Sequence, residues 1–118
     1  MKPRLLAFLL AVAMLPFGAW AQDKAPAGDA ARGKRIFAAD GCYECHGYAG
    51  QGGRLTGPRV ARTELPYAAF VRLLRQPPDE MPPYTAKVLS GKDSADIFAY
   101  LQSLPAPPAP KDIAILQY

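Results

Sequence analysis

The pentapeptide Cys42-Tyr43-Glu44-Cys45-His46 constrains the fold of this chain more than any other stretch. Cys42 and Cys45 are the only cysteines in the sequence, and His46 is the only histidine. Two thiols that are separated by two residues, and followed at once by an imidazole, can act on one and the same group. The rest of the chain must therefore fold around whatever these three side chains hold.

The pattern C-x-x-C-H is the attachment signature of a c-type haem. Two thiols at this spacing can reach the two vinyl groups on one edge of a porphyrin and form thioether bonds with them. The imidazole of the histidine then lies beneath the iron, where it can coordinate from one side. We therefore expect one covalent haem c, attached through Cys42 and Cys45, with His46 as an axial iron ligand.

Three other uses of a C-x-x-C pair stay open. A thioredoxin-like redox pair belongs in a βαβ context, and the sequence lacks the alternating β-branched runs that predict strands. A structural zinc site needs four Cys or His ligands, and this sequence offers three. A disulfide between Cys42 and Cys45 would have to close a very short loop. The sequence favours haem attachment over all three.

Met81 is the candidate for the sixth position of the iron. Met1 and Met14 lie in a segment that we expect to be removed, and a second imidazole is absent from the sequence. Residues 77–83 contain four prolines, which exclude a helix and favour a stiff, extended loop around Met81. A histidine and a methionine together form the axial pair of electron-transfer cytochromes. The alternative is that Met81 is ordinary core filler.

Residues 1–21 have the pattern of a secretory signal peptide. Lys2 and Arg4 form a positive start, residues 5–15 are almost wholly apolar, and Ala19-Trp20-Ala21 resembles a cleavage site. The apolar run is shorter than the about 20 residues that a membrane span needs, although retention as an uncleaved anchor is the alternative. We expect export to the bacterial periplasm, where haem is attached to reduced thiols, and no membrane span in the mature chain.

Cleavage would leave 97 residues, which is enough for one domain with a small core. The net charge would fall from +4 to +2 because two cations leave with the signal. The basic balance of the whole chain is therefore no sign of nucleic-acid binding. A basic stretch interleaved with aromatic residues, which would favour such binding, is also absent from the sequence.

The remaining sequence predicts three helices separated by loops. The first spans residues 30–39 after Asp29 as N-cap, the second spans 63–76 with Thr63 as N-cap, and the last begins at Ser90 and ends at Leu104. Ser90 and Asp93 form an acidic version of the capping box. We expect a flexible arm over residues 22–28, a helical domain over 29–104, and a proline-rich tail over 105–118.

Two glycines are expected to permit close contacts. Gly33 lies inside the first predicted helix, where it favours a close crossing by the last helix, with Tyr100 or Ile97 as the ridge that crosses it; mere tolerance of glycine is the alternative. The loop over residues 47–58 is rich in glycine, as expected of a backbone that wraps a flat porphyrin edge. Gly57 and Pro58 close this loop.

Several residues are predicted to surround the haem or to face a partner. A ligating imidazole normally donates its second N–H to an acceptor, and the Pro58 carbonyl is our candidate; the alternative is that Pro58 only terminates the loop. Tyr84 is expected to pack near the haem edge, with ordinary half-exposed packing as the alternative. Arg72 and Arg75 either pair with propionates or a partner, or form a solvated face.

The end of the tail is unusually apolar for a free terminus. Its apolar residues are Ile113, Ile115, Leu116 and Tyr118. We expect them to fold back onto the domain, with binding to a partner subunit as the alternative.

The order of these elements resembles that of the class I cytochromes c, over residues 29–104. The matching positions are Gly33 and Phe37 in the first helix, the C-x-x-C-H motif, Gly57-Pro58, Met81 before a proline, and Tyr100 in the last helix. The resemblance implies a small all-α fold in which helices wrap one covalent haem. It also implies single-electron transfer, so the protein is not an enzyme by itself.

Within that family, the short loops and the M-P-P-Y run look like the small cytochrome subunits of periplasmic flavin-dependent alkylphenol dehydrogenases. This resemblance implies a redox protein partner, such as a flavoprotein subunit from which the cytochrome accepts electrons. The expected domain has few lysines, namely Lys34, Lys87 and Lys92. This favours an apolar interface over purely electrostatic docking. The alternatives are a freely diffusing shuttle to a terminal oxidase or reductase, a haem sensor, and a haem-free C-x-x-C protein.

Overall fold

The structure is a computed structural model that describes residues 24–117. The expected signal over residues 1–21 and the terminal Tyr118 lie outside the described residues. In the described part the elements are α1 (Ala30–Ala39), α2 (Cys42–His46), α3 (Tyr67–Arg75), α4 (Gly91–Ser103), and the 3-10 turns η1 (Pro110–Asp112) and η2 (Ala114–Leu116). Residues 24–117 contain no strand, so the all-α prediction is confirmed. No helix in this part of the chain is long and apolar enough to cross a membrane.

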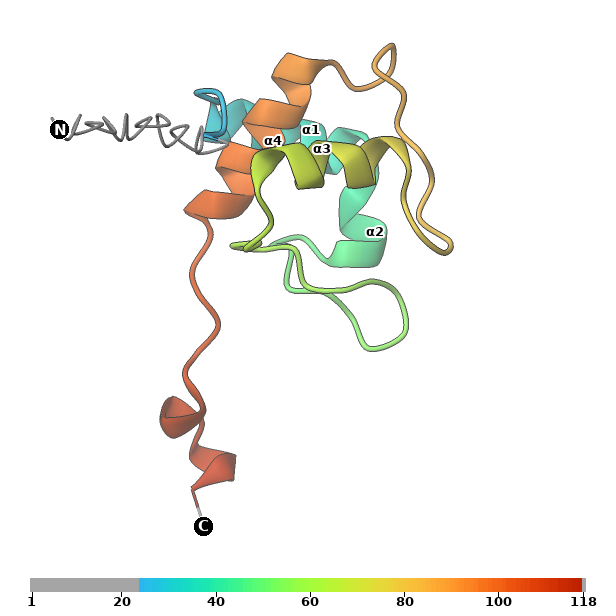
Figure 1. Ribbon diagram of the computed structural model, residues 1–118. Helices are drawn as coiled ribbons and strands as arrows, with labels where there is room; N and C mark the ends of the chain where they lie inside the picture. Colours follow the sequence, from blue (N-terminus) through green and yellow to red (C-terminus); the bar gives the residue numbers. More distant parts are fainter. Residues whose placement is uncertain (1–23, 118) are drawn as a thin grey trace, which may run out of the picture.

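The core forms where α1 packs across α4. Figure 1 shows this crossing, with α3 beside α4, with α2 and the green loop that follows it below the helices, and with the loop between α3 and α4 at the right. The buried core residues come from α1, α3, α4 and the loop just before α4; they are Phe37, Phe70, Leu74, Leu89, Ile97, Tyr100 and Leu101. Each of the three longer helices therefore packs apolar side chains into the core, as amphipathic helices require.

Gly33 allows the backbones of α1 and α4 to approach closely. A Cβ atom placed on Gly33 would lie 1.9 Å from the Asp96 carbonyl oxygen and 2.8 Å from the Ile97 amide nitrogen. The close crossing at Gly33 is thus confirmed. Gly33, however, contacts the backbone of α4 and not the expected side chain of Ile97 or Tyr100. Tyr100 instead packs edge-on against Phe37, with 5.6 Å between ring centroids.

Gly28 makes a second close approach to α4, which the sequence did not predict. A Cβ atom on Gly28 would lie 2.3 Å from the carbonyl oxygen of Ala95. The last residue of the expected flexible arm therefore lies against the domain. The chain enters α1 directly from this contact, because Asp29 is the N-cap and its side chain accepts a hydrogen bond from the Arg32 amide.

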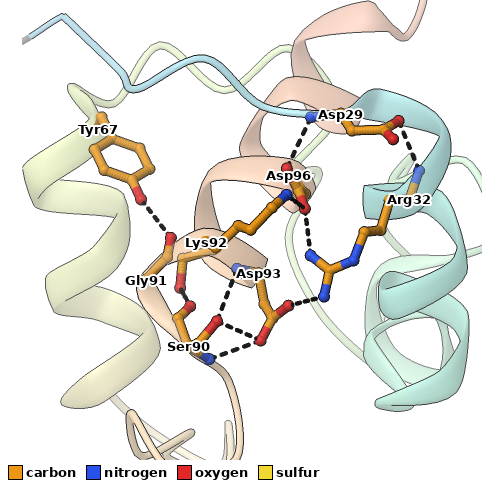
Figure 2. Close-up of polar contacts among 9 residues, drawn as sticks. Asp29, Arg32, Tyr67, Ser90, Gly91, Lys92, Asp93 and Asp96 are labelled. Carbon is orange, nitrogen blue, oxygen red and sulfur yellow. Dashed lines mark hydrogen bonds and ion pairs between the residues drawn. The ribbon is translucent and has the colours of Figure 1, made fainter.

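A buried carboxylate joins α1 to α4 beside this crossing (Figure 2). The Asp96 side chain is fully buried and accepts hydrogen bonds from Lys92 Nζ (2.8 Å), from the Asp29 amide (2.8 Å) and from Arg32. The same guanidinium of Arg32 also pairs with Asp93. The bond from Lys92, followed by the bond from the Asp29 amide, holds the pKa of Asp96 well below its usual range.

We expect Asp96→Asn to lower the free energy of unfolding by about 2 kcal/mol, because charge-assisted hydrogen bonds to a buried group are lost. Asp96 has a lower pKa folded than unfolded, so its carboxylate stabilises the fold above the ordinary Asp pKa. That contribution to stability is lost as the pH falls through the pKa that Asp96 has in the folded protein. Urea unfolding below pH ~4 should therefore be less pH-dependent in Asp96→Asn than in the wild type. Asp112→Asn, in the exposed tail, is the control; equal acid sensitivity of Asp96→Asn and wild type would contradict the assignment.

The start of α3 differs from the prediction. The helix begins at Tyr67 with Pro66 at the N-cap position, and Thr63 is not its cap. The Thr63 hydroxyl instead accepts a hydrogen bond from the Leu65 amide at 3.3 Å, within a turn. The reason is that a proline disfavours helical geometry in the residue before it, so Leu65 cannot belong to the helix. The predicted capping box of α4, formed by Ser90 and Asp93, is confirmed.

The tail does not fold back onto the domain, so that expectation was wrong. Among the described elements, η1 and η2 contact each other and neither contacts α1–α4. Figure 1 shows this red end of the chain leading away from the helices. Ile115 is 73% exposed and Leu116 is 52% exposed. The prolines between residues 105 and 110 explain the difference, because they favour an extended polyproline conformation that carries the end away.

Candidate cofactor site

The structure brings Cys42, Cys45, His46 and Met81 to the wall of one cavity. Its volume is about 1000 Å³, at the upper end of the about 300–1000 Å³ typical of ligand pockets. The walls come from α1, α2, α3, α4 and the loops on either side of α3. Residues from sequence positions far apart thus converge on a space of the size that a large planar cofactor needs.

The helical turn of α2 presents both thiols. Gly41 begins this turn with a φ of 74°, a left-handed conformation that suits glycine. Cys42 and Cys45 are then one helical turn apart on the same face. Cys42 is half-buried, Cys45 is exposed, and neither is in a disulfide.

The environment of Cys42 disfavours a reactive thiolate. Burial raises the pKa of its thiol, and the nearby Asp40 carboxylate raises it further. Redox-active C-x-x-C pairs have the opposite property, a lowered thiol pKa. Residues 24–117 also contain no cluster of three or more His, Cys, Asp and Glu side chains that could hold a metal ion by themselves. The raised pKa of Cys42 is therefore unlike that of the reactive cysteine in a dithiol redox pair.

The imidazole of His46 is oriented by the loop that follows it. Its Nδ1 lies 2.8 Å from the carbonyl oxygen of Pro58. Because a carbonyl can only accept, Nδ1 carries the proton, and the lone pair of Nε2 stays available to a metal. Gly57 permits this approach, since a Cβ atom there would lie 3.2 Å from Nδ1 and 3.0 Å from the Cys45 carbonyl oxygen.

Two further hydrogen bonds fasten this loop to α2, and neither had a distinctive signal in the sequence. The Thr56 hydroxyl donates to the Cys45 carbonyl oxygen at 2.8 Å. The Gly52 amide donates to the His46 carbonyl oxygen at 2.7 Å. The glycine-rich loop thus returns to the helical turn that it leaves, and its residues Thr56, Gly57 and Pro58 form part of the cavity wall.

Met81 lines the same cavity and lies in the proline-rich segment after α3. Its side chain is half-buried and packs against the core cluster. The segment turns at Asp79, which has a φ of 56°, a conformation that aspartate tolerates better than most residues. Met81 is therefore held in a bent, stiff loop whose side chains line the cavity.

Tyr84 connects the methionine loop, residues 77–83 around Met81, to the residues before the first cysteine. Its hydroxyl donates to the Asp40 carbonyl oxygen at 2.9 Å. Burial is the main cause that raises the pKa of Tyr84 to about 12, so the hydroxyl remains a donor at neutral pH. Tyr84 lines the cavity, but Arg72 and Arg75 do not. Arg59, which the sequence reasoning missed, is a cation on the cavity wall.

These residues fit a c-type haem. The site offers two free thiols on one helical turn, an imidazole with a free nitrogen, and a thioether. Leu65 and Leu73 are 39% and 36% exposed and both line the cavity, so a flat apolar ring there would cover them. The other apolar walls are core side chains, among them Phe37, Phe70, Leu74 and Leu101.

Comparisons with known proteins agree with this chemistry. The family described as "Cytochrome C oxidase, cbb3-type, subunit III" matches residues 28–101, which include α1, α2, α3, most of α4 and every residue that lines the cavity. The chain is also 30% identical over 94 residues to a protein of Corynebacterium diphtheriae named "Cytochrome bc1 complex cytochrome c subunit". The alignment covers 78% of this chain and 33% of that relative. The chain therefore spans about a third of the length of the curated relative it matches.

Proposed function

The chain belongs to the class I c-type cytochromes, with covalently bound haem c, and from that premise we propose that it carries single electrons on an iron held by His46 and Met81. The observation that supports this proposal most strongly is the shared cavity. His46 and Met81 both line it, together with the two thiols that the attachment motif requires. A histidine–methionine pair is the axial set of cytochromes that transfer electrons.

The bound group supplies the chemistry, a change of the iron between its ferric and ferrous states. The chain supplies position and surroundings. Cys42 and Cys45 fix the edge of the ring, and the Pro58 carbonyl orients the His46 imidazole. Apolar side chains of α1, α3 and α4 exclude water from the cavity. On this proposal the protein acts as an electron carrier and not as an enzyme by itself.

The proposed location is the periplasm, reached by a cleaved signal over residues 1–21. The sequence pattern of that segment supports the proposal. Attachment of haem to reduced thiols outside the cytoplasm fits the same location. The charge of the proposed mature chain is small, so docking to its partner would depend mainly on shape and apolar contact.

As its partner we propose a dehydrogenase that delivers electrons to the haem, with the flavoprotein of an alkylphenol-type enzyme as the first candidate. The two comparisons favour a second candidate, a complex of the respiratory chain. The matching family carries the name of an oxidase subunit, and the relative carries the name of a bc1 complex subunit. Both candidates share the same role for this chain, a single-electron carrier.

The haem and its ligation can be tested on protein produced in a host that matures c-type cytochromes. We expect a visible spectrum with one haem per chain, and haem that stays with the polypeptide in acidified organic solvent. The ferric protein should show the weak long-wavelength band of an iron–thioether bond. A colourless product from such cells would refute the haem proposal and favour the haem-free alternative.

The partner can be tested by gel filtration of a gentle extract of the source cells, with haem absorbance and flavin fluorescence followed together. Co-elution of both signals at a mass well above one small domain would support the flavoprotein partner. Haem that elutes in a flavin-free membrane complex would support the respiratory candidate. Haem that elutes alone and small would oppose both stable assemblies and indicate a diffusing shuttle.

A further inference from the structure

The methionine loop is closed at its base by contacts between α3 and Tyr84. The Tyr84 amide donates to the Leu74 carbonyl oxygen at 2.8 Å. The Arg75 guanidinium donates through Nη1 to the Tyr84 carbonyl oxygen at 2.7 Å. Both backbone polar groups of Tyr84 are thus bound by the last turn of α3, and the segment that carries Met81 leaves and returns at the same place.

Arg75 extends this closure to the last helix. Its Nη2 lies 3.4 Å from Oγ of Ser94, a longer contact than the one to Tyr84. Ser94 is fully buried in α4, and its hydroxyl also donates to the Ser90 carbonyl oxygen at 3.0 Å. A single guanidinium therefore joins α3, the methionine loop and α4.

We propose that Arg75 is a positioning residue for the sixth iron ligand, because it holds closed the base of the loop that carries Met81. The proposal rests on the proposed ligation by Met81. Arg75 does not line the cavity, so it acts through Tyr84 and not on the haem. The sequence offered pairing with propionates or with a partner, or a solvated face, for this residue; within the described residues its guanidinium contacts Tyr84 and Ser94.

The geometry of the contact explains why arginine is needed. A planar guanidinium offers donors in a fixed fork, so one side chain can hold a backbone carbonyl and a hydroxyl that belong to different elements. Lysine has a compact ammonium on a flexible stem and cannot reproduce this fork. The thioether is a weak axial ligand, so a small loosening of its loop should favour states in which the iron is open.

The experiment compares Arg75→Lys and Arg75→Met with wild type, using the full mature holoprotein. The matched control is Arg72→Met, because Arg72 is exposed on the same helix and its side chain makes no hydrogen bond or ion pair within the described residues. The readouts are the long-wavelength thioether band of the ferric protein and the rate at which the ferrous protein binds carbon monoxide. The free energy of unfolding is measured in parallel.

We expect Arg75→Met to raise the carbon monoxide binding rate about tenfold and to weaken the thioether band, while Arg72→Met changes neither. Arg75→Lys should lie close to Arg75→Met rather than close to wild type. Loss of stability without a change in either ligation readout would overturn the proposal and make Arg75 merely structural. If Arg75→Met does not fold, Arg75→Lys and Ser94→Ala decide by the same readouts, and wild-type ligation in both would overturn it.

Failure of the ligation proposal is recognised separately. If the wild type lacks the thioether band, Met81 is not the ligand, whatever Arg75 does. If the wild type shows the band and both Arg75 variants keep it with unchanged carbon monoxide kinetics, the ligation stands and the role of Arg75 falls.

Discussion

Met81→Ala is expected to keep its covalent haem and to bind carbon monoxide in the ferrous state about a hundredfold faster than the wild type. The haem stays because Cys42 and Cys45 attach it, and His46 still holds one side of the iron. The binding rate rises because the thioether no longer competes for the sixth position. A factor of this size corresponds to a wild type in which Met81 is dissociated from the iron in about 1% of the molecules.

The spectrum and the reduction potential of Met81→Ala provide further measurements. The long-wavelength thioether band should be lost, and the potential should fall by on the order of 100 mV, since axial ligands set haem potentials over about 0.8 V. Leu73→Ala is the control, because Leu73 lines the same cavity without a ligating atom. An unchanged Met81→Ala spectrum would show that Met81 is not the ligand. Fast carbon monoxide binding already in the wild type would favour the haem-sensor alternative.

The sequence predicted the parts of this protein that depend on local chemistry. The motif at residues 42–46 and the capping box at Ser90 each depend on residues close together in the chain. The 2.8 Å contact between His46 and Pro58 was also predicted, because a ligating imidazole needs an acceptor and a Gly-Pro pair offers a carbonyl. The roles of His46 and Met81 toward an iron remain proposals.

The features that the sequence did not predict depend on long-range contacts. Arg75 looked like one of two surface arginines, yet its carbonyl partner is a backbone group with no signal in residue type. Asp96 is buried between Arg32 of α1 and Lys92 of α4. Sequence alone does not predict this, because aspartate is normally expected at the surface. The tail was expected to fold back because its apolar residues are conspicuous, but the prolines before it carry it away.

The close crossing of α1 and α4 at Gly33 depends both on a local residue type and on a long-range contact. Disrupting this crossing should have the largest effect on stability. We expect Gly33→Ala to lower the free energy of unfolding by about 3 kcal/mol. Alanine favours a helix over glycine by about 1 kcal/mol, so local propensity alone predicts the opposite sign. The new methyl group, however, would lie 1.9 Å from the Asp96 carbonyl oxygen. The loss therefore measures how firmly α1 and α4 are held together.

Gly91→Ala is the matched control for this prediction. Gly91 is the first residue of α4, and a Cβ atom there would meet nothing within 4 Å. We expect this variant to be more stable than wild type by about 0.5 kcal/mol, because alanine restricts the unfolded chain. Urea unfolding of both variants, followed by the far-ultraviolet helix signal, separates crowding from propensity. If Gly33→Ala were as stable as Gly91→Ala, the two helices would have room to separate, and the crossing would not fix the shape of the haem cavity.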